Sequence, residues 1–515
     1  MIYHLFQYLE RAGVDIPGMG LMHYLSFRAM MATVAAVLFS LLVGKRIIRL
    51  LQRHQIGDVP RDLGLDGAEL KKGVPTMGGI IIILGLLTGV LLFCDLTSVY
   101  VILLLVSTLW CGALGFADDY LKLKDKKVIS ANGVRDAKKH DGLPEKVKLL
   151  GQVALGFIVG LTVWMSPDIV VREKVADPAI EVVTGRSDLD VNTETQVTSG
   201  RYQEEDVVKS TKTTIPFVKR HEFDYRWLSP FKGAWGWYAK WAIYVLMIVL
   251  VITACSNGTN LTDGLDGLAA GTSAIVGVVI GILAWLSGNL IDSNYLNIMY
   301  IPGTGEVAIF MSAFVGALIG FLWYNSYPAQ VFMGDTGSLT IGGIIGVSAV
   351  LIRKELLLPL LCGIFFVESL SVILQRTWFK FTRVKRGQGR RIWSMTPLHH
   401  HYQSWKKVKG TEPWTYVEMI PEGLNNRYSK PNGGHGFHEV KVTLRFWIVQ
   451  IRRPWPYLMR VRLKCSRWRM TDRLSTKKMP HRRGRSSSLR MRTALTPMIP
   501  PMVRLPVSPM NTCAG

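Results

Sequence analysis

The chain has 515 residues, of which 49% are hydrophobic, and its formal net charge is +24 at pH 7. Its mean hydropathy of +0.23 and its long apolar runs exclude an ordinary soluble globular protein. The six cysteines show no CxxC or Cys/His spacing, which argues against a zinc site or a disulfide framework. The N-terminal stretch lacks the charged start, apolar middle and small-residue cleavage site of a secretory signal.

Ten apolar segments are candidate transmembrane helices, because about 17–25 apolar residues are needed to cross a bilayer as a helix. They lie near residues 25–44, 77–94, 99–117, 147–166, 236–254, 268–288, 306–324, 338–352 and 355–375, and a tenth begins at about 441. The tenth stops early, before Arg452. The sequence therefore predicts an all-α polytopic membrane protein with about ten transmembrane helices.

Basic residues are concentrated in the loops after the first, third and ninth segments, over 45–72, 122–148 and 376–391. Short loops rich in Lys and Arg stay in the cytoplasm, so these loops are predicted to be cytoplasmic and the N-terminus to be outside. The long loop 167–234 then lies on the outer side, where we expect no catalytic role for it. Its β-branched run over 207–215 predicts a short strand or disorder.

The most unusual polar stretch covers residues 257–267, between two apolar segments. Asn257, Asn260, Asp263 and Asp266 recur at every third position, and a glycine follows each aspartate. Asn and Asp offer oxygen atoms to a metal ion or to ribose hydroxyls, and glycine lets the backbone approach a ligand closely. An ordinary capped turn between two helices is the alternative interpretation.

Two other segment ends on the same predicted face carry aspartates. Asp118 and Asp119 end the third segment, where two adjacent carboxylates indicate a cation site or a general base. A helix end exposed to water is the alternative. Asp335 precedes the eighth segment between glycines, whose open backbone N–H groups would suit a phosphate, although a plain N-cap would give the same pattern.

A run of three histidines, His399, His400 and His401, follows the ninth segment. Adjacent histidines cannot easily bind one metal ion and no cysteine lies nearby, so imidazoles beside phosphates are favoured over a zinc site. Lys71 and Lys72 begin the stretch that opens the second segment. Positive charge on the cytoplasmic side and a Pro-Gly turn are the plainer explanation of that stretch.

The predicted topology brings five aspartates from three loops to one membrane face, namely Asp118, Asp119, Asp263, Asp266 and Asp335. Carboxylates hold Mg²⁺, and the metal and lysines neutralise phosphate oxygens. The set therefore predicts magnesium-dependent chemistry on a diphosphate. The adjacent membrane indicates that one substrate is a lipid.

Five motifs in this order resemble those of the phospho-N-acetylmuramoyl-pentapeptide transferase family; they lie at residues 75–79, 118–120, 257–267, 332–335 and 397–402. The resemblance runs from about residue 20 to 450. It implies a ten-helix enzyme of the bacterial cytoplasmic (inner) membrane with its active site facing the cytoplasm. Its members use Mg²⁺ to transfer phospho-MurNAc-pentapeptide from UDP-MurNAc-pentapeptide to undecaprenyl phosphate, giving lipid I and UMP for peptidoglycan synthesis.

The resemblance also implies roles for individual residues. Asp335 would be the main metal ligand, Asp118 the base that deprotonates the lipid phosphate, and Asp119 a neighbour of the metal or the phosphates. The implied substrate-binding residues are Lys71, Thr76, Lys122, Asn257, Asn260, Asp263, Gly264, Leu265, Asp266 and Phe332, with 264–266 at the uracil and Phe332 stacked on it. His399, His400 and His401 would act at the sugar-phosphate side. A homodimer is compatible with the resemblance.

Two alternatives remain open at this point. One is a sister enzyme that transfers N-acetylglucosamine-1-phosphate, or another sugar phosphate, from UDP to a polyprenyl phosphate. The other is a transporter, although transporters place ionisable groups near the bilayer midplane and often show repeated halves, and neither feature is visible here.

The chain departs from the family pattern in two places. Residues 1–451 form the predicted transferase domain, with the outer loop 167–234 as an insertion. Residues 452–515 carry sixteen Arg or Lys and one acid, Asp472, in a segment without periodicity. We expect a disordered tail or the product of a reading-frame change rather than a nucleic-acid-binding arm, because few aromatic residues are interleaved with the charges.

Overall fold

A computed structural model describes residues 1–14, 16–54, 71, 73–132, 142–172, 207–215, 222–296, 298–393, 395–403 and 437–452. The chain divides into two units, Met1–Cys465 and Ser466–Gly515, and every described residue belongs to the first. The predicted tail beyond Arg452 and most of the outer loop lie outside the described residues.

Helices account for nearly all of the described secondary structure. They are α1 (Ile2–Arg11), η1 (Met19–His23), α2 (Leu25–His54), α3 (Gly79–Phe93), α4 (Val99–Asn132), α5 (Glu145–Met165), η4 (Tyr225–Leu228), α7 (Gly233–Thr262), α8 (Leu268–Gly288), α9 (Leu290–Leu296), α10 (Thr304–Asn325), α11 (Gly334–Leu351), η5 (Glu355–Leu357), α12 (Leu358–Leu361), α13 (Gly363–Arg386), α14 (Leu398–Tyr402) and α16 (Glu439–Arg452). A helix therefore stands at each of the predicted apolar segments.

Seven of the described helices are long and apolar enough to cross a membrane, namely α2, α4, α5, α7, α8, α10 and α11. An eighth span results if η5 and α12 are joined to α13, from which they are bent by 81°. Helices α3, with 15 residues, and α16, with 14, are shorter than a typical span. The all-α polytopic prediction is confirmed, whereas the count of about ten spans stays a prediction.

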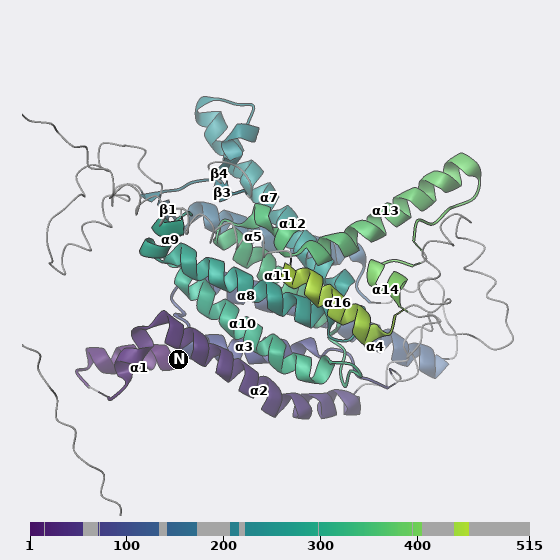
Figure 1. The fold of residues 1–515 in the computed structure, drawn as a ribbon, viewed down its shortest axis with the longest axis horizontal. Helices are drawn as coiled ribbons and strands as arrows, with labels where there is room; N and C mark the ends of the chain where they lie inside the picture. The colour runs from purple at the N-terminus through teal and green to yellow at the C-terminus, as the bar shows by residue number, and fades with distance from the viewer. Residues whose placement is uncertain are drawn as a thin grey trace, which may run out of the picture. The chain divides into compact units, whose positions relative to one another are not determined.

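Two short antiparallel sheets flank the helices. Strand β1 (Val171–Arg172) pairs with β2 (Val207–Val208), and β3 (Lys212–Thr214) pairs with β4 (Glu222–Asp224). Of the short strand or disorder predicted over 207–215, the structure has strand, divided between β2 and β3 in two different sheets. The amide of Thr214 donates to the carbonyl oxygen of Arg353 at 3.0 Å, which ties β3 to the chain just after α11. In Figure 1 these strands lie at one end of the helices and α14 lies at the other.

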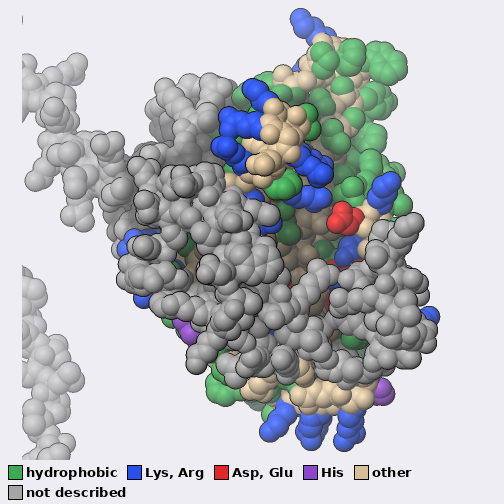
Figure 2. Space-filling view, turned by 90° about the vertical axis from the view of Figure 1, so that its right-hand side faces the viewer, with side chains coloured by type: hydrophobic (Ala, Val, Ile, Leu, Met, Phe, Trp, Pro, Cys, Tyr) green, Lys and Arg blue, Asp and Glu red, His purple; other side chains and the backbone are tan. Residues whose placement is uncertain are grey.

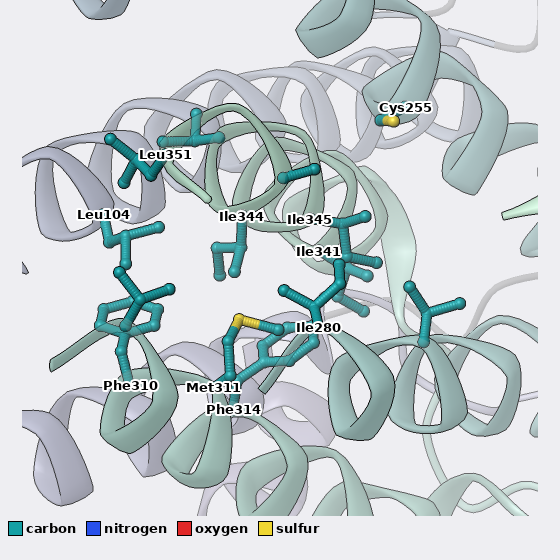
Figure 3. Packing of buried hydrophobic residues seen from close by; sticks show 14 of the residues in the cluster. Leu104, Cys255, Ile280, Phe310, Met311, Phe314, Ile341, Ile344, Ile345 and Leu351 are labelled. Atoms are coloured by element: carbon teal, nitrogen blue, oxygen red, sulfur yellow. The ribbon is translucent and has the colours of Figure 1, made fainter. Parts of the chain in front are cut away.

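Helix α11 is the centre of the hydrophobic core. Every residue from Thr336 to Leu351 is buried, and the helix packs against α3, α4, α7 and α8. Figure 3 shows Ile344 of α11 facing Phe310 and Met311 of α10. A helix surrounded on all sides needs apolar or small residues around its whole circumference, which explains its uniform composition.

Glycines allow α3 and α4 to approach the start of α11 closely. A Cβ atom at Gly115 of α4 would lie 2.3 Å from the carbonyl oxygen of Asp335, and one at Gly79 of α3 would lie 2.2 Å from the amide of Gly337. Small residues permit such close backbone contact between membrane helices. The contact at Gly115 places the polar end of α4 directly beside the first turn of α11.

Candidate active site

Three carboxylates meet where α4 and α11 cross. Asp118 and Asp119 belong to α4 and Asp335 to the first turn of α11, and their oxygen atoms lie within 4.8 Å of one another. Asp118 is fully buried and Asp119 is 5% exposed, so the alternative of a helix end open to water is wrong. Carboxylates held this close repel one another unless cations compensate them.

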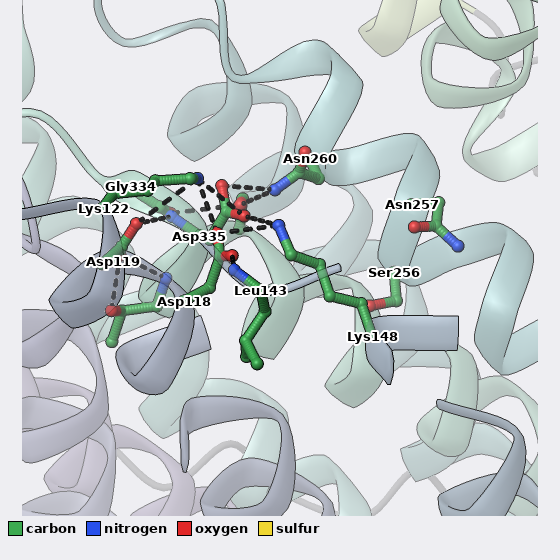
Figure 4. A network of polar contacts seen from close by, with 12 residues as sticks. Asp118, Asp119, Lys122, Leu143, Lys148, Ser256, Asn257, Asn260, Gly334 and Asp335 are labelled. Carbon is green, nitrogen blue, oxygen red and sulfur yellow. Dashed lines mark hydrogen bonds and ion pairs between the residues drawn. The ribbon is translucent and has the colours of Figure 1, made fainter. Parts of the chain in front are cut away.

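Two lysines supply part of that compensation. The Lys122 Nζ atom lies 2.6 Å from Asp118 Oδ2 and 3.1 Å from Asp335 Oδ2. Lys148, from α5, places its Nζ atom 2.7 Å from each of the same two oxygens (Figure 4). Among the described residues, three carboxylates against two ammonium groups leave a formal surplus of one negative charge. Sequence analysis counted Lys148 only as a cytoplasmic loop charge and missed this position.

Asp119 caps the N-terminus of α11 from a neighbouring helix. Its Oδ1 accepts the amide of Asp335 at 3.1 Å, and its Oδ2 accepts the amide and the hydroxyl of Thr336 at 2.9 and 2.7 Å. Free N–H groups at a helix start favour an anionic acceptor. The N-cap position of α11 is Met333, and Asp335 lies inside the first turn, so the interpretation of Asp335 as a plain N-cap is wrong. Its carboxylate is directed to the lysines instead.

The stretch 257–267 is part helix and part loop. Helix α7 continues through Thr262, so Asn257 and Asn260 lie on its last turns rather than in a loop. Asn260 Nδ2 donates to Asp335 Oδ1 at 2.9 Å. Asn257 points elsewhere and donates to Gln152 Oε1 of α5 at 2.8 Å. The structure thus brings Asn260 to the carboxylates and leaves Asn257 outside them.

A cavity of about 320 Å³ opens beside the carboxylates. It is lined by Lys71, Thr76, Asp119, Lys122, Leu123, Asn260, Asp263, Gly264, Leu265, Asp266, Asn325, Phe332, Gly334 and Asp335. Every predicted substrate-binding residue except Asn257 is in this set. The predicted catalytic residues Asp118, His399, His400 and His401 do not line the cavity themselves.

At one side of the cavity Lys71 is held by two acids. Its Nζ atom lies 2.8 Å from Asp266 Oδ1 and 2.7 Å from Glu439 Oε1, and 5.9 Å from the centre of the Phe332 ring. Burial alone would lower the pKa of Lys71, but the attraction of Glu439 and Asp266 outweighs it and raises that pKa. Lys71 is therefore a firmly charged donor. Glu439, 173 residues away from Asp266, was missed by sequence analysis.

Asp263 lies among like charges. Burial, followed by the negative charges of Asp335, Asp119 and Asp266, raises its pKa to about 8. At neutral pH the side chain accordingly holds a proton in the absence of a cation. A cation in the cavity would favour its ionised form.

The three histidines lie on α14, behind the cavity wall. His399 is fully buried, with its Nδ1 atom 3.4 Å from Glu368 Oε2. Its Nε2 atom abuts Gly264, where an added Cβ would come within 2.1 Å. His400 Nδ1 lies 2.7 Å from Gln403 Oε1. Burial, with a contribution from His399, lowers the pKa of His400 to about 4, so its imidazole is neutral at neutral pH.

Comparison with known proteins agrees with this geometry. A model of Glycosyl transferase family 4 matches residues 210–353. The phospho-N-acetylmuramoyl-pentapeptide transferases of Parabacteroides distasonis and Flavobacterium psychrophilum are each 48% identical to this chain over 451 residues, covering 88% of the chain and 97% of the relative. The enzyme of the same name from Porphyromonas gingivalis is 47% identical over 453 residues, with the same coverage. The chain belongs to the phospho-N-acetylmuramoyl-pentapeptide transferase family.

Proposed function

We propose that this chain transfers phospho-MurNAc-pentapeptide from UDP-MurNAc-pentapeptide to undecaprenyl phosphate and releases lipid I and UMP. One observation carries the proposal beyond family membership. Asp119 and Asp335 of the acidic triad line the same cavity as Lys71 and as Asp266 and Phe332, which the resemblance assigns to the uracil side. A UDP-linked substrate that spans this cavity would have its diphosphate beside cations and its uracil beside an aromatic ring.

The acidic triad is a suitable site for Mg²⁺. Mg²⁺ prefers hard oxygen ligands, and the triad offers carboxylate oxygens within 4.8 Å of one another with more negative charge than the two lysines neutralise. We propose that Asp335 holds the ion, with Asp118 and Asp119 beside it. The bound ion would neutralise the diphosphate and make UMP a better leaving group.

The contacts of Asp118 suggest a role besides that of a base. Its Oδ1 accepts the amide of Leu143 at 2.7 Å, and its Oδ2 lies beside the ammonium groups of Lys122 and Lys148. We propose that Asp118 mainly holds these lysines where the phosphates bind. Deprotonation of a phosphate monoester, whose second pKa is near 6, is undemanding at neutral pH. Near-normal turnover of Asp118→Asn across pH 6–9 with saturating Mg²⁺ would exclude the role of a base.

Charge distribution supports a cytoplasmic site. Figure 2 views the end of the structure at which α2 and α13 terminate, and Lys and Arg side chains gather on it. The C-terminal parts of these two helices are basic, with Lys45, Arg46, Arg49 and Arg53 in α2 and Arg383, Lys385 and Arg386 in α13. Basic residues at helix ends mark the cytoplasmic side. We therefore place the site on the cytoplasmic face of the bacterial inner membrane.

The sister activity on another UDP-sugar is the second candidate. Incubation of the purified full-length protein with undecaprenyl phosphate, Mg²⁺ and either UDP-MurNAc-pentapeptide or UDP-N-acetylglucosamine separates the two. We expect UMP release only with the first donor. UMP release only with the second would reassign the sugar while leaving the metal chemistry unchanged. The transporter alternative is set aside, because the chain belongs to a transferase family.

A further inference from the structure

Helix α16 supports the loop on the implied uracil side of the cavity from behind. Glu439 Oε1 accepts the backbone amide of Asp266 at 2.8 Å, and the Thr443 hydroxyl donates to the carbonyl oxygen of Asp266 at 3.4 Å. Between them, Val442 packs against Leu265 in a small cluster of buried side chains. One helix therefore holds both polar backbone groups of Asp266.

The same glutamate oxygen also binds Lys71. Glu439 Oε1 lies 2.7 Å from Lys71 Nζ, which in turn contacts Asp266 Oδ1 at 2.8 Å. The second oxygen of Asp266 accepts the amide of Ala329 at 3.1 Å. Glu439 and Asp266 are only 5% and 4% exposed. These contacts fix the Lys71 ammonium group beside the Asp266 carboxylate.

The hydrogen-bonding groups of Lys71 and Asp266 are complementary to the edge of uracil but not to that of cytosine. Uracil presents a carbonyl oxygen beside an N–H group, so it needs a donor beside an acceptor, as Lys71 and Asp266 provide. Cytosine presents an amino group beside an unprotonated nitrogen, which reverses the pattern. Glu439 is absent from the residues that line the cavity, so any influence on the nucleotide passes through its two partners.

We propose that Glu439 is a positioning residue for nucleotide recognition: by holding Lys71 and the Asp266 backbone, it sets the affinity for a uridine nucleotide and the preference over cytidine. The inference rests on the proposed function for the identity of the nucleotide. It predicts an effect on nucleotide binding alone, because Glu439 contacts none of the triad Asp118, Asp119 and Asp335 among the described residues.

The test compares Glu439→Gln, Glu439→Ala and Thr443→Val in the full-length protein. Gln keeps an oxygen for the Asp266 amide but loses the charge that holds Lys71, whereas Ala loses both. Glu306→Gln is the matched control, because Glu306 is a partly buried glutamate paired with Arg28 at 2.7 Å outside the cavity. Binding of UMP and CMP is measured by calorimetry with Mg²⁺, alongside kcat, both KM values and the melting temperature.

We expect Glu439→Ala to weaken UMP binding and raise the KM for the UDP substrate by about 10- to 100-fold, as for loss of one charge-assisted hydrogen bond. Gln should show a smaller loss, the UMP-to-CMP preference should fall, and the KM for the lipid phosphate should not change. Thr443→Val should weaken UMP binding with unchanged kcat, and Glu306→Gln should bind UMP normally.

Normal UMP binding by Glu439→Ala with a lowered melting temperature would overturn the inference, since the residue would then be merely structural. An equal rise in the KM for the lipid phosphate would overturn it too. If the Ala variant does not fold, the UMP and CMP affinities of Glu439→Gln and Thr443→Val decide by the same criteria. Weakened UMP binding in a protein that releases no UMP from the proposed donor would refute the proposed function and leave the inference standing.

Discussion

Replacement of Lys148 by methionine removes an α5 side chain that links Asp118 of α4 to Asp335 of α11. Its Nζ atom lies 2.7 Å from Asp118 Oδ2 and from Asp335 Oδ2. The contact with Asp335 is a charge-assisted hydrogen bond, and the contact with Asp118 is an ion pair. An enzyme donor aimed at developing charge contributes about 10²–10³ in rate. We therefore expect Lys148→Met to lower kcat about 100- to 1,000-fold.

The loss should be accompanied by a change in the response to Mg²⁺. Without Lys148, Lys122 is the only lysine of the described residues that is paired with the three carboxylates. The surplus of negative charge therefore grows, and a divalent cation should bind more tightly. The assay is UMP release as a function of Mg²⁺ concentration, with the Mg²⁺-induced rise in melting temperature measured in parallel. Lys148→Arg, which keeps the charge, should retain part of the activity.

Lys146→Met is the matched control, because Lys146 is exposed on the same helix, two residues earlier. We expect its kcat to stay within about twofold of the unaltered protein, as for most surface substitutions. A Lys148→Met variant that turns over as fast as this control, with unchanged Mg²⁺ dependence, would refute the assignment of Lys148 to the active site.

Three further predictions concern the cavity itself. Asp335→Ala should abolish both turnover and Mg²⁺ dependence in the UMP-release assay, and an unchanged Mg²⁺ response would remove Asp335 from the metal site. Because the pKa of Asp263 is raised to about 8, Mg²⁺ binding at pH 7 should release a proton, and Mg²⁺ affinity should rise with pH up to about 8. Calorimetry in buffers of different ionisation enthalpy measures this proton release, which Asp263→Asn should abolish. Proton release that persists in Asp263→Asn would show that the proton does not come from Asp263. Gly264→Ala would place a Cβ 2.1 Å from His399 Nε2, so we expect it to displace α14 and reduce kcat, whereas unimpaired turnover would show that the histidine run tolerates movement.

The raised pKa of Asp263 also determines how this residue contributes to folding stability at different pH. Its pKa in the folded protein lies above the ordinary value of 3.8, so the proton it holds stabilises the folded state at low pH. That contribution is complete below about pH 4 and is lost as the pH rises through about 8. Bound Mg²⁺ would reverse the preference by favouring the carboxylate.

Local patterns in the sequence were sufficient to predict the helices and the convergence of the acids. Apolar length predicted where each helix lies, and the bias of Lys and Arg predicted that Asp118, Asp263 and Asp335 share one face. The three-residue rhythm of 257–267 was correctly judged unusual, but α7 extends through Thr262. Helical spacing turns Asn257 toward α5 and Asn260 toward Asp335, a difference that a loop interpretation could not reveal.

The missed residues depend on packing between distant segments. Lys148 and Asp335 are 187 residues apart, and Glu439 and Asp266 are 173 apart. No local pattern distinguishes Lys148 from the other lysines of its loop, since its function comes from the way α5 packs beside α4 and α7. The cap that Asp119 provides for α11 likewise arises only because Gly115 allows the two helices to touch.

The most direct test of the central claim is simultaneous measurement of both products from the purified full-length protein. UDP-MurNAc-pentapeptide, undecaprenyl phosphate and Mg²⁺ are supplied, UMP is quantified, and the lipid product is identified by mass spectrometry. We predict equal amounts of UMP and undecaprenyl-diphospho-MurNAc-pentapeptide, and neither product after chelation of Mg²⁺ or in Asp335→Ala. Lipid product without UMP, or undiminished formation of both in Asp335→Ala, would contradict the assignment of this carboxylate site to the transfer.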